Sequence, residues 1–364
     1  MNLTKRQVTL SLIKNLLPRK YYDEIFFNKL LFRKNLKILN LYEILWCAIH
    51  GFLPHEYKLY ELKKNDFRSY VSSRANFQKR ILNGSYNAIL ANKILFEKHI
   101  KLIIKEIDGL HVVESIGYIE GGYLQSLNKN IINGDFTSLQ IFLERTDLIL
   151  KPISGDGGMG LILISKKNDH YMLNNKIVTW NEIVEKVGSL NDYLIQERIS
   201  QQGFSNEIYP PTVNTIRIAT MIDPFTQKPF IPYSFHRFGL PVSGIADNVN
   251  QGGLFSLINV ADGKLSMLVD YSVSGTKENF ENHPVTLKKV VNEQIPHWKK
   301  LTERIIEMAG RMPYLKYVGW DIVLSDNEFY ILEGNVSPGI GFQMMKPMKE
   351  FPEAWSFFKH YKFV

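Results

Sequence analysis

The stretch VGWDIVLSDNEFYILEGNVSPG, residues 318–339, decides the fold that this sequence predicts. It contains two apolar runs, 319–324 and 328–332, that are rich in Ile, Val, Leu, Phe and Tyr. The turn-forming residues Ser325-Asp326-Asn327 separate the two runs, and such a pattern is typical of a β-hairpin. We therefore predict two short antiparallel strands in this stretch.

Three oxygen-bearing side chains, Asp321, Glu333 and Asn335, lie on this hairpin. Side chains two residues apart on a strand point to the same face, so Glu333 and Asn335 can converge. The antiparallel return brings Asp321 alongside them. Two carboxylates and an amide oxygen suit Mg²⁺ held against substrate phosphates, although the spacing alone is equally compatible with an ordinary hairpin with polar ends.

A glycine-rich segment, Gly155-Asp156-Gly157-Gly158-Met159-Gly160, formally matches the dinucleotide-binding fingerprint. That fingerprint must open a helix, whereas the strand-like run 161–165 follows here. The segment lacks the Gly-Lys-Ser/Thr of a Walker A loop, and no protein-kinase motif follows it. We interpret it as a hairpin whose backbone amides cover phosphate oxygens beside Lys151, with a tight structural turn as the alternative.

The hairpin and the glycine segment together resemble a known family. Asp321, Glu333, Asn335 and Ser337-Pro338-Gly339 resemble the metal-binding end of the ATP-grasp ligases, which join carboxylates to amines using ATP. The upstream matches are Lys151-Pro152 with Gly155 to Gly160 (the phosphate-covering loop), Tyr193 to Arg198 (the adenine-binding hinge strand) and Asn214-Thr215-Ile216-Arg217 (the phosphate-contacting arginine strand). With Asp247-Asn248, Gly252-Gly253 and Gly319-Trp320-Asp321, the pattern is closest to the sugar-transfer-associated branch, over roughly residues 70 to 345.

The resemblance implies an α+β chain with the ATP-grasp fold, in which two α+β lobes hold ATP between antiparallel sheets. A basic helical N-terminal region, residues 1–90, would precede a catalytic region, residues 91–364. Within the catalytic region, 91–200 would form the nucleotide-covering lobe and 201–364 the metal- and substrate-binding lobe.

The resemblance also implies roles for individual residues. ATP would be bound by Lys93, Lys151, Gly155, Gly157, Gly158, Gln196, Glu197 and Ile199. Lys93 is preceded by Asn92, where the family usually has an acidic residue. Asp321, Glu333 and Asn335 would hold one or two Mg²⁺ ions, with Mn²⁺ as an alternative. Arg217 and Arg237 would steady the phosphoryl group and the substrate, and Asn248, Gly252 and Gly253 would contact the substrate. His236 alternates with Arg237 on a strand, so we expect it to be a packed histidine.

Composition agrees with a soluble enzyme. The chain has 364 residues, of which 45% are hydrophobic and 22% charged, which are ordinary values for two or three packed lobes. Its single cysteine, Cys47, excludes an internal disulfide, and its apolar surroundings predict a buried, inert thiol in a reducing compartment. The N-terminus is not a convincing signal peptide and the apolar run 38–53 is too short to span a bilayer. We expect a cytoplasmic protein without a transmembrane segment.

The net charge of +8 is concentrated in the first part of the chain, because residues 1–105 contain 20 Lys and Arg against 7 Asp and Glu. This part could be an ordinary solvated surface, or could attract an anionic substrate, an acidic partner or the anionic inner face of a membrane. We see no zinc finger, helix-turn-helix or aromatic-basic motif that would indicate nucleic acid. Periodicity predicts helices in this part, short strands after about residue 110, and further helices at 181–188 and 286–311.

The function that these features predict is an ATP-dependent carboxylate-amine ligase that forms an amide through an acyl phosphate. Its small-molecule partners would be an amine and a sugar acid or amino acid. By analogy with the branch it resembles, the sugar could be linked to a nucleotide or lipid and belong to surface-polysaccharide (capsule) biosynthesis. Two alternatives remain open. One is an ATP-grasp kinase that phosphorylates a hydroxyl, and the other is a catalytically silent nucleotide-binding regulatory protein.

Overall fold

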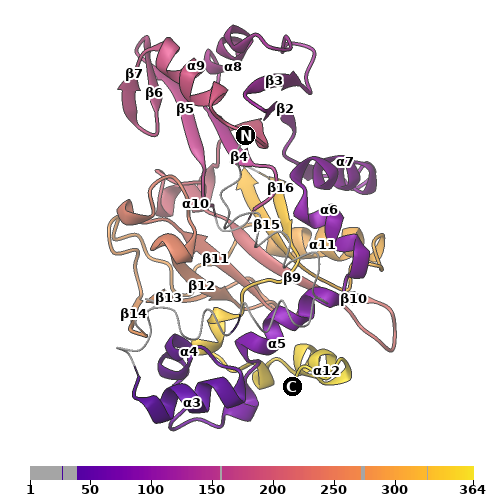
Figure 1. Ribbon diagram of the computed structural model, residues 1–364. Helices are drawn as coiled ribbons and strands as arrows, with labels where there is room; N and C mark the ends of the chain where they lie inside the picture. Colours follow the sequence, from indigo (N-terminus) through magenta and orange to yellow (C-terminus); the bar gives the residue numbers. More distant parts are fainter. Residues whose placement is uncertain (1–26, 28–38, 156–157, 272–274, 326) are drawn as a thin grey trace.

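Helices at the front of the chain are followed by two β-sheets, as Figure 1 shows. The computed structural model describes residue 27 and residues 39–155, 158–271, 275–325 and 327–364. The α-helices are α3 (Leu41–His50), α4 (Pro54–Leu59), α5 (Ser73–Gln78), α6 (Asn87–Ala91), α7 (Lys93–Ile103), α8 (Gln140–Leu143), α9 (Trp180–Gly188), α10 (Gly203–Ile208), α11 (Trp298–Gly310) and α12 (Pro352–His360). The predicted α+β class and the helical N-terminal region are confirmed.

The small sheet has seven strands in the order β3-β2-β8-β4-β5-β6-β7, and all of its pairs are antiparallel. Its strands are β2 (Ser115–Glu120), β3 (Tyr123–Ser126), β4 (Leu148–Pro152), β5 (Ile162–Lys167), β6 (His170–Leu173), β7 (Lys176–Val178) and β8 (Tyr193–Glu197). Two-residue turns join β5 to β6 and β6 to β7. Asn168, Asp169, Asn174 and Asn175 all have positive φ in these turns, which Asn and Asp tolerate better than most residues.

The large sheet has nine strands, and eight of them follow the order β1-β16-β15-β9-β11-β12-β13-β14, with β10 paired to β9. Its strands are β1 (Leu110–Val112), β9 (Ile216–Ile222), β10 (Pro229–Phe230), β11 (Ser234–Phe238), β12 (Leu254–Ile258), β13 (Leu265–Tyr271), β14 (Lys277–Phe280), β15 (Tyr317–Ser325) and β16 (Glu328–Asn335). The predicted hairpin is therefore β15 and β16. β1 runs parallel to β16, and the domain boundaries at residues 90 and 200 stay predictions.

Both faces of the large sheet pack against other parts of the chain. Successive side chains of a strand point to opposite faces, so a strand such as β9 contributes to two cores. Ile216 and Ile218 of β9 pack with α11 in one hydrophobic core. Ala219 and Met221 of the same strand pack into a second core with residues of α12 and of the region of α3, α4 and α5. We call these three helices the N-terminal helices. We call this second side the N-terminal face. Arg217 lies between Ile216 and Ile218, so it projects from the N-terminal face.

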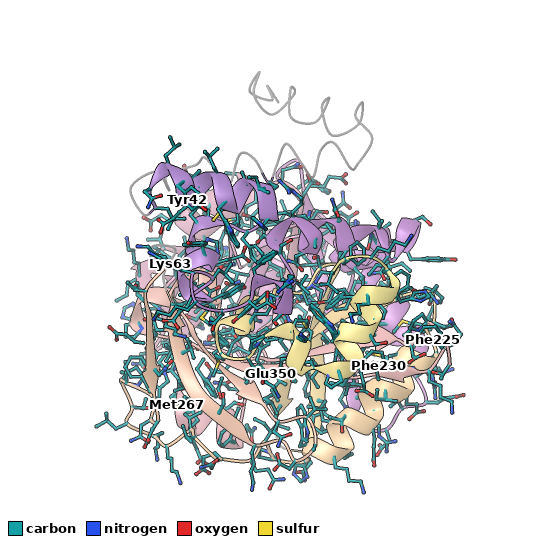
Figure 2. All side chains as sticks on the ribbon, turned by 90° about the horizontal axis from the view of Figure 1, so that it is seen from below. Tyr42, Lys63, Phe225, Phe230, Met267 and Glu350 are labelled. Carbon is teal, nitrogen blue, oxygen red and sulfur yellow. The ribbon has the colours of Figure 1, made fainter. Side chains whose placement is uncertain are left out.

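The N-terminal helices lie beside the C-terminal segment beneath the large sheet (Figure 1). Figure 2 shows this side from below, with Tyr42 on α3 and Glu350 in the C-terminal segment labelled. A reciprocal pair of hydrogen bonds joins Val71 to the Gln343 side chain, from Val71 N to Oε1 (2.8 Å) and from Nε2 to Val71 O (3.0 Å). The Asn83 side chain makes the same double contact with the backbone of Tyr317, at 2.9 and 3.1 Å. These buried bonds fix the N-terminal helices on the N-terminal face.

The helix predicted at 286–311 begins only at Trp298, whereas α9 confirms the helix predicted at 181–188. Residues before α11 adopt left-handed backbone at Leu287, Asn292 and His297, with φ of 60°, 63° and 55°. Pro296 lacks the backbone N–H that a helix interior requires. The apolar spacing in this segment therefore reflects packing of an irregular chain against the first core.

Cys47 confirms the prediction of a buried thiol, because it is fully buried in α3 and burial, with the nearby Glu56 and Glu43, raises its pKa to about 12. A thiol with so high a pKa is a poor nucleophile.

Among the helices of the described residues, none has the length and apolar character to cross a membrane.

Candidate active site

A cavity of about 160 Å³ lies between the two sheets. Its walls come from β4, β5 and β8 of the small sheet and from β11, β15 and β16 of the large sheet. The structure brings most of the predicted site residues to this cavity: Lys93, Lys151, Gly155, Gly158, Gln196, Glu197, Ile199, Arg237, Asn248, Asp321 and Glu333. Residues spread over more than 200 positions of the sequence therefore converge, as a shared binding site requires. We call this the first cavity.

A second cavity, of about 250 Å³, adjoins the first and shares Arg237, Asn248 and Glu333 with it. The predicted residues Arg217 and Asn335 line this second cavity. Aromatic side chains that sequence reasoning missed form much of its wall: Phe235, Phe255, Tyr271 and Phe342. They come from separate strands and loops, so only the sheet pairing brings them together.

Two predicted glycines are not among the described residues that line either cavity. Gly252 has φ +92°, a left-handed conformation that favours glycine. A Cβ on Gly253 would lie 2.4 Å from the carbonyl oxygen of Asp247. Both glycines thus shape the backbone beside Asn248, and their predicted contact with substrate stays a prediction. Gly157 lies outside the described residues.

Asp321 forms a buried ion-pair network with two arginines on neighbouring strands. Arg217 donates to it through Nε and through a terminal nitrogen, the latter at 2.8 Å, and Arg237 donates at 2.9 Å. Burial by itself would raise the pKa of Asp321, but the two guanidinium groups hold it well below its usual range. Asp321 is therefore ionised, and it orients both arginines at the boundary of the two cavities.

Glu333 lies opposite Asp321 because of a β-bulge in β16. The register pairs Ile322 with Ile331 but Asp321 with Glu333, so Leu332 is the extra residue. If the register of the preceding residues continued, Leu332 would face Asp321 and Glu333 would face Trp320 on the core side. A bulge re-aims side chains in this way and is frequent next to active sites. The two carboxylates are therefore neighbours, as predicted.

Burial raises the pKa of Glu333, and the negative charge of Asp321 raises it further, although Lys93, Lys151 and Arg217 act in the opposite direction. Lys93 Nζ is 3.9 Å from Glu333 Oε2. The Glu333 carboxylate is thus less fully compensated by positive charge than that of Asp321. A cation at this position would relieve the repulsion between the two acids.

The donor set fits a divalent cation that is shared with phosphate. Asp321, Glu333 and Asn335 offer hard oxygen ligands, and the Asn335 side-chain nitrogen donates to Gly319 O at 3.3 Å. In the part of the chain that the structure describes, no group of three or more His, Cys, Asp or Glu side chains could hold a metal alone. Mg²⁺ commonly uses one or two carboxylates and completes its shell with waters and substrate phosphates. Asp321 already accepts hydrogen bonds from Arg217 and Arg237. Glu333 is therefore the carboxylate that is more available to a cation.

Two lysines give the first cavity positive charge. Lys93 is the first residue of α7, where Asn92 caps the helix, and its Nζ donates to Gly155 O at 2.9 Å. Lys151, at the end of β4, is only 9% exposed, and burial lowers its pKa to about 8. Anionic phosphates would offset the effect of burial on the Lys151 ammonium group. Gly158, with φ +68°, packs over the loop that contains Ala246.

The first cavity also has apolar walls, which suit a planar base. Its walls include Val113, Ile149, Met159, Leu161, Leu163 and Leu332. The Gln196 side chain donates to Val113 O at 3.1 Å and to Ser115 Oγ at 3.2 Å, so its nitrogen is already used inside the protein. Glu197 is paired with Arg145 at the edge of the cavity. Of the two hinge side chains, Glu197 is the more accessible.

Asp247 and Thr215 are functional candidates that residue-by-residue reasoning did not select. Asp247 accepts hydrogen bonds from Thr215 N (2.7 Å) and Thr215 Oγ1 (2.5 Å), and it lies 3.4 Å from Arg237 Nε. Arg237 Nε also donates to Thr215 Oγ1 at 2.9 Å. These contacts hold Arg237 in place. Both residues belong to motifs that are visible in the sequence, Asn214-Thr215-x-Arg217 and Asp247-Asn248. Only the fold shows that Thr215 and Asp247 contact each other.

His236 confirms its prediction as a packed histidine. It is fully buried, its Nε2 is 2.9 Å from Ser205 Oγ, and its ring stacks on Phe238. Burial lowers its pKa to about 3. It is therefore neutral and lies on the opposite side of β11 from Arg237.

Comparison with known proteins agrees with this geometry. The sequence profile of the family described as sugar-transfer associated ATP-grasp matches residues 72–353, which is more than half of the chain. The fold and the cavity, taken with this match, define an ATP-grasp protein, from a family of ATP-dependent enzymes. The chain belongs to the sugar-transfer associated ATP-grasp family. No curated protein matches it significantly.

Solved structures resemble the chain only distantly. An ADP complex of purK, N5-carboxyaminoimidazole ribonucleotide synthetase, has a TM-score of 0.40 at 10% identity, over 70% of this chain and 46% of its own. VanG D-Ala:D-Ser ligase from Enterococcus faecalis has 0.41 at 12%, over 74% and 62%. D-alanine–D-alanine ligase from Bacillus anthracis has 0.35 at 11%, over 93% and 92%. The chain thus spans less than two thirds of the length of the first two.

Proposed function

We propose that this protein is an ATP-dependent carboxylate-amine ligase that forms an amide through an acyl phosphate. The observation that carries the proposal is the pair of adjoining cavities that share Arg237, Asn248 and Glu333. The first cavity has lysines for phosphates and apolar walls, which suit a nucleotide. The second has Arg217 and aromatic walls, which suit an organic carboxylate. The reacting groups would meet at the shared residues.

ATP would lie with its base against the apolar walls and its phosphates toward Lys93 and Lys151. Asp321, Glu333 and Asn335 would hold Mg²⁺, which neutralises the charge that builds up on the phosphate oxygens. Glu197 is our candidate for the ribose hydroxyls, because the Gln196 nitrogen is already hydrogen-bonded. Backbone amides near Gly155 and Gly158 would close over the phosphates and exclude water.

The reaction would proceed in two balanced steps. A carboxylate oxygen of the substrate attacks the γ-phosphorus of ATP, the bond to the bridging oxygen breaks, and ADP leaves. The amine then attacks the acyl carbon, loses a proton, and displaces phosphate to give the amide. Arg217 and Arg237 steady the negative oxygens in both steps, since a guanidinium fork matches carboxylate and phosphate geometry. Positioning and charge neutralisation suffice for phosphoryl transfer, so no covalent nucleophile of the protein is needed.

We further propose a sugar acid, free or linked to a nucleotide or lipid, as the carboxylate, in the biosynthesis of a surface polysaccharide. The family description, sugar-transfer associated, supports this substrate class. The two arginines at the second cavity support an anionic substrate.

A hydroxylamine trap tests the ligase activity. The full-length protein is incubated with ATP, Mg²⁺ and a panel of uronic acids and amino acids, and ADP and hydroxamate are measured. We expect hydroxamate with at least one acid, and its loss in Glu333→Gln but not in Glu303→Gln, a control at an exposed glutamate of α11. ADP release with a hydroxyl acceptor and no hydroxamate would instead establish a kinase.

A further inference from the structure

A third cavity, of about 140 Å³, adjoins the second cavity, because Tyr271 and Gly341 line both. Its remaining wall comes largely from the N-terminal helices, through residues that include Glu56, Ser73 and Asn76. The mechanism described above uses none of these three. They lie on the N-terminal face of the large sheet, the face from which Arg217 projects.

Glu56 is a buried carboxyl group, only 5% exposed. One of its oxygens accepts from Leu53 N at 2.8 Å and completes the start of α4. The other accepts from Ser73 Oγ at 2.8 Å and, more weakly, from Tyr60 OH at 3.4 Å. A carboxylate offers about four lone-pair positions. The backbone of Ser73 also interacts with the carboxylate, so a bound ammonium group would take the place of the weak contact with Tyr60 OH, which also lies 3.5 Å from Ile340 O.

Glu56 has no ion-pair partner among the described residues. The described lining of the third cavity contains no lysine or arginine either. An ionised carboxylate that is buried without a countercharge is costly. A ligand that brings a positive charge would remove this cost.

Asn76 supplies a second, independent acceptor. Its Oδ1 is buried and accepts no hydrogen bond in the structure. The backbone carbonyl of Asn76 accepts from Ser337 Oγ at 2.9 Å, and Ser337 lines the second cavity. Asn76 therefore lies where the second and third cavities approach each other. A buried acceptor without a donor is rare and marks a place where a donor is expected to bind.

The wall residues Glu56 and Tyr60 precede residue 72, where the match to the family profile begins. This part of the cavity thus lies outside the residues that the family profile matches. The two adjoining cavities also differ in charge, because the second is lined by two arginines and the third by a carboxyl group without lysine or arginine.

We propose that the third cavity binds an ammonium group of the acceptor substrate, through Glu56 and Asn76, while a different amine of the same molecule reacts in the second cavity. The acceptor would then be a diamine or a basic amino compound. This inference rests on the proposed ligase function for its catalytic consequence. The binding of the ammonium group itself does not depend on turnover.

Binding is tested by titration calorimetry of the full chain at about pH 8 with 1,4-diaminobutane and with 1,4-butanediol, its neutral counterpart. Because hydrogen bonds to charged groups are stronger, we expect the diamine to bind at least about tenfold more tightly than the diol. Glu56→Gln should lower diamine affinity by about tenfold and Asn76→Ala by severalfold. Glu303→Gln is the control and should change nothing. Asn76→Ala removes no hydrogen bond of the side-chain oxygen, so it serves if Glu56→Gln does not fold.

Equal binding of diamine and diol, absent diamine binding, or affinity that neither variant changes would overturn the inference. Turnover adds a separate comparison, because n-butylamine must present its only amine to the acyl phosphate. We expect kcat/KM to favour 1,4-diaminobutane over n-butylamine, and Glu56→Gln to abolish that preference. If no amine is consumed while diamine binding still depends on Glu56, the proposed function fails and the assignment of the cavity stands.

Discussion

Asp321 and Glu333 face each other across β15 and β16, yet their charges are compensated very differently. Asp321 is held by Arg217 and Arg237, whereas Glu333 has Lys93 at 3.9 Å and the carboxylate of Asp321 as a neighbour. The bulge at Leu332 creates this arrangement. This difference supports separable roles in the proposed mechanism, in which Asp321 orients the two arginines and Glu333 binds the cation.

Glu333→Gln should abolish turnover without loss of stability. Because burial and Asp321 raise the pKa of Glu333, its charge is unfavourable in the folded protein above its unfolded pKa, and a neutral amide removes that penalty. We expect the free energy of unfolding in urea to be equal or higher at pH 8. Loss of a metal ligand should lower kcat/KM by at least about 100-fold. A large loss of stability would contradict the assigned charge balance.

Asp321→Asn should destabilise the protein, because it leaves the buried Arg217 without its counterion. Breaking a buried pair in this way costs about 3 to 5 kcal/mol. Urea unfolding of this variant should be compared with Asp169→Asn, at a side chain that is 99% exposed. If both variants unfold at the same urea concentration, the network does not stabilise the fold.

Gly158→Ala should weaken ATP binding. A Cβ there would lie 3.3 Å from Gln251 Nε2 and 3.4 Å from Ala246, at φ +68°, and would obstruct closure of the glycine loop. Gly121→Ala is the matched control, because Gly121 also has positive φ (+57°) but nothing within 4 Å of the added atom. We expect KM for ATP to rise severalfold, by about 1 kcal/mol of binding, only in Gly158→Ala. The same rise in both variants would show that backbone strain alone matters.

ATP affinity should fall above about pH 8, because the buried Lys151 has a pKa of about 8 and must be protonated to pair with phosphate. Bound phosphates raise that pKa, so the dissociation constant can increase by up to about tenfold per pH unit. Calorimetry of ATP binding from pH 7 to 9 measures this. Lys151→Met should bind weakly and lose most of the pH dependence. A wild-type affinity that stays constant to pH 9 would argue against phosphate contact.

Glu56 should make stability fall as pH rises from about 5 to 7. Burial raises its pKa to about 7, so the unfolded chain ionises first, and up to about 3 kcal/mol is lost across this window. Cys47, Tyr60 and Tyr271, with raised pKa values, do not titrate there. Burial lowers the pKa of the neighbouring His55 from 6.5 to about 4, so His55 makes stability rise with pH over about 4 to 6.5 and opposes the effect of Glu56. Urea unfolding at several pH values isolates Glu56 as a difference: the stability of wild type relative to Glu56→Gln should fall by up to about 3 kcal/mol from pH 5 to 7. A stability difference that stays constant over this range would contradict the prediction.

The sequence allowed the hairpin, the glycine segment and most of the nucleotide cavity to be predicted, since each is encoded by short local patterns. Strand alternation and turn residues define β15 and β16, and the family motifs place Lys151 and Glu333 at one cavity. The bulge at Leu332 has no local signature, because Leu continues the apolar run and only the pairing with β15 shows the extra residue.

Contacts between distant segments could not be predicted. The Asp247–Thr215 pairing, the aromatic wall around Phe235 and the Glu56 cavity all depend on how strands and helices stack. The false prediction of helix at 286–297 has the same origin, because apolar residues of an irregular segment pack on the core without helical hydrogen bonds. Burial imposes apolar spacing there, and that spacing resembles a helical period.

The most direct test of the ligase mechanism follows oxygen atoms. The acid that gives hydroxamate is labelled with ¹⁸O in its carboxylate and converted with ATP and the amine, and the released phosphate is analysed by mass spectrometry. An acyl phosphate transfers one carboxylate oxygen to phosphate, so we predict phosphate with one ¹⁸O, and none in reactions with Glu333→Gln. Unlabelled phosphate from an active reaction, or a phosphate that stays on the organic product, would contradict the proposed function.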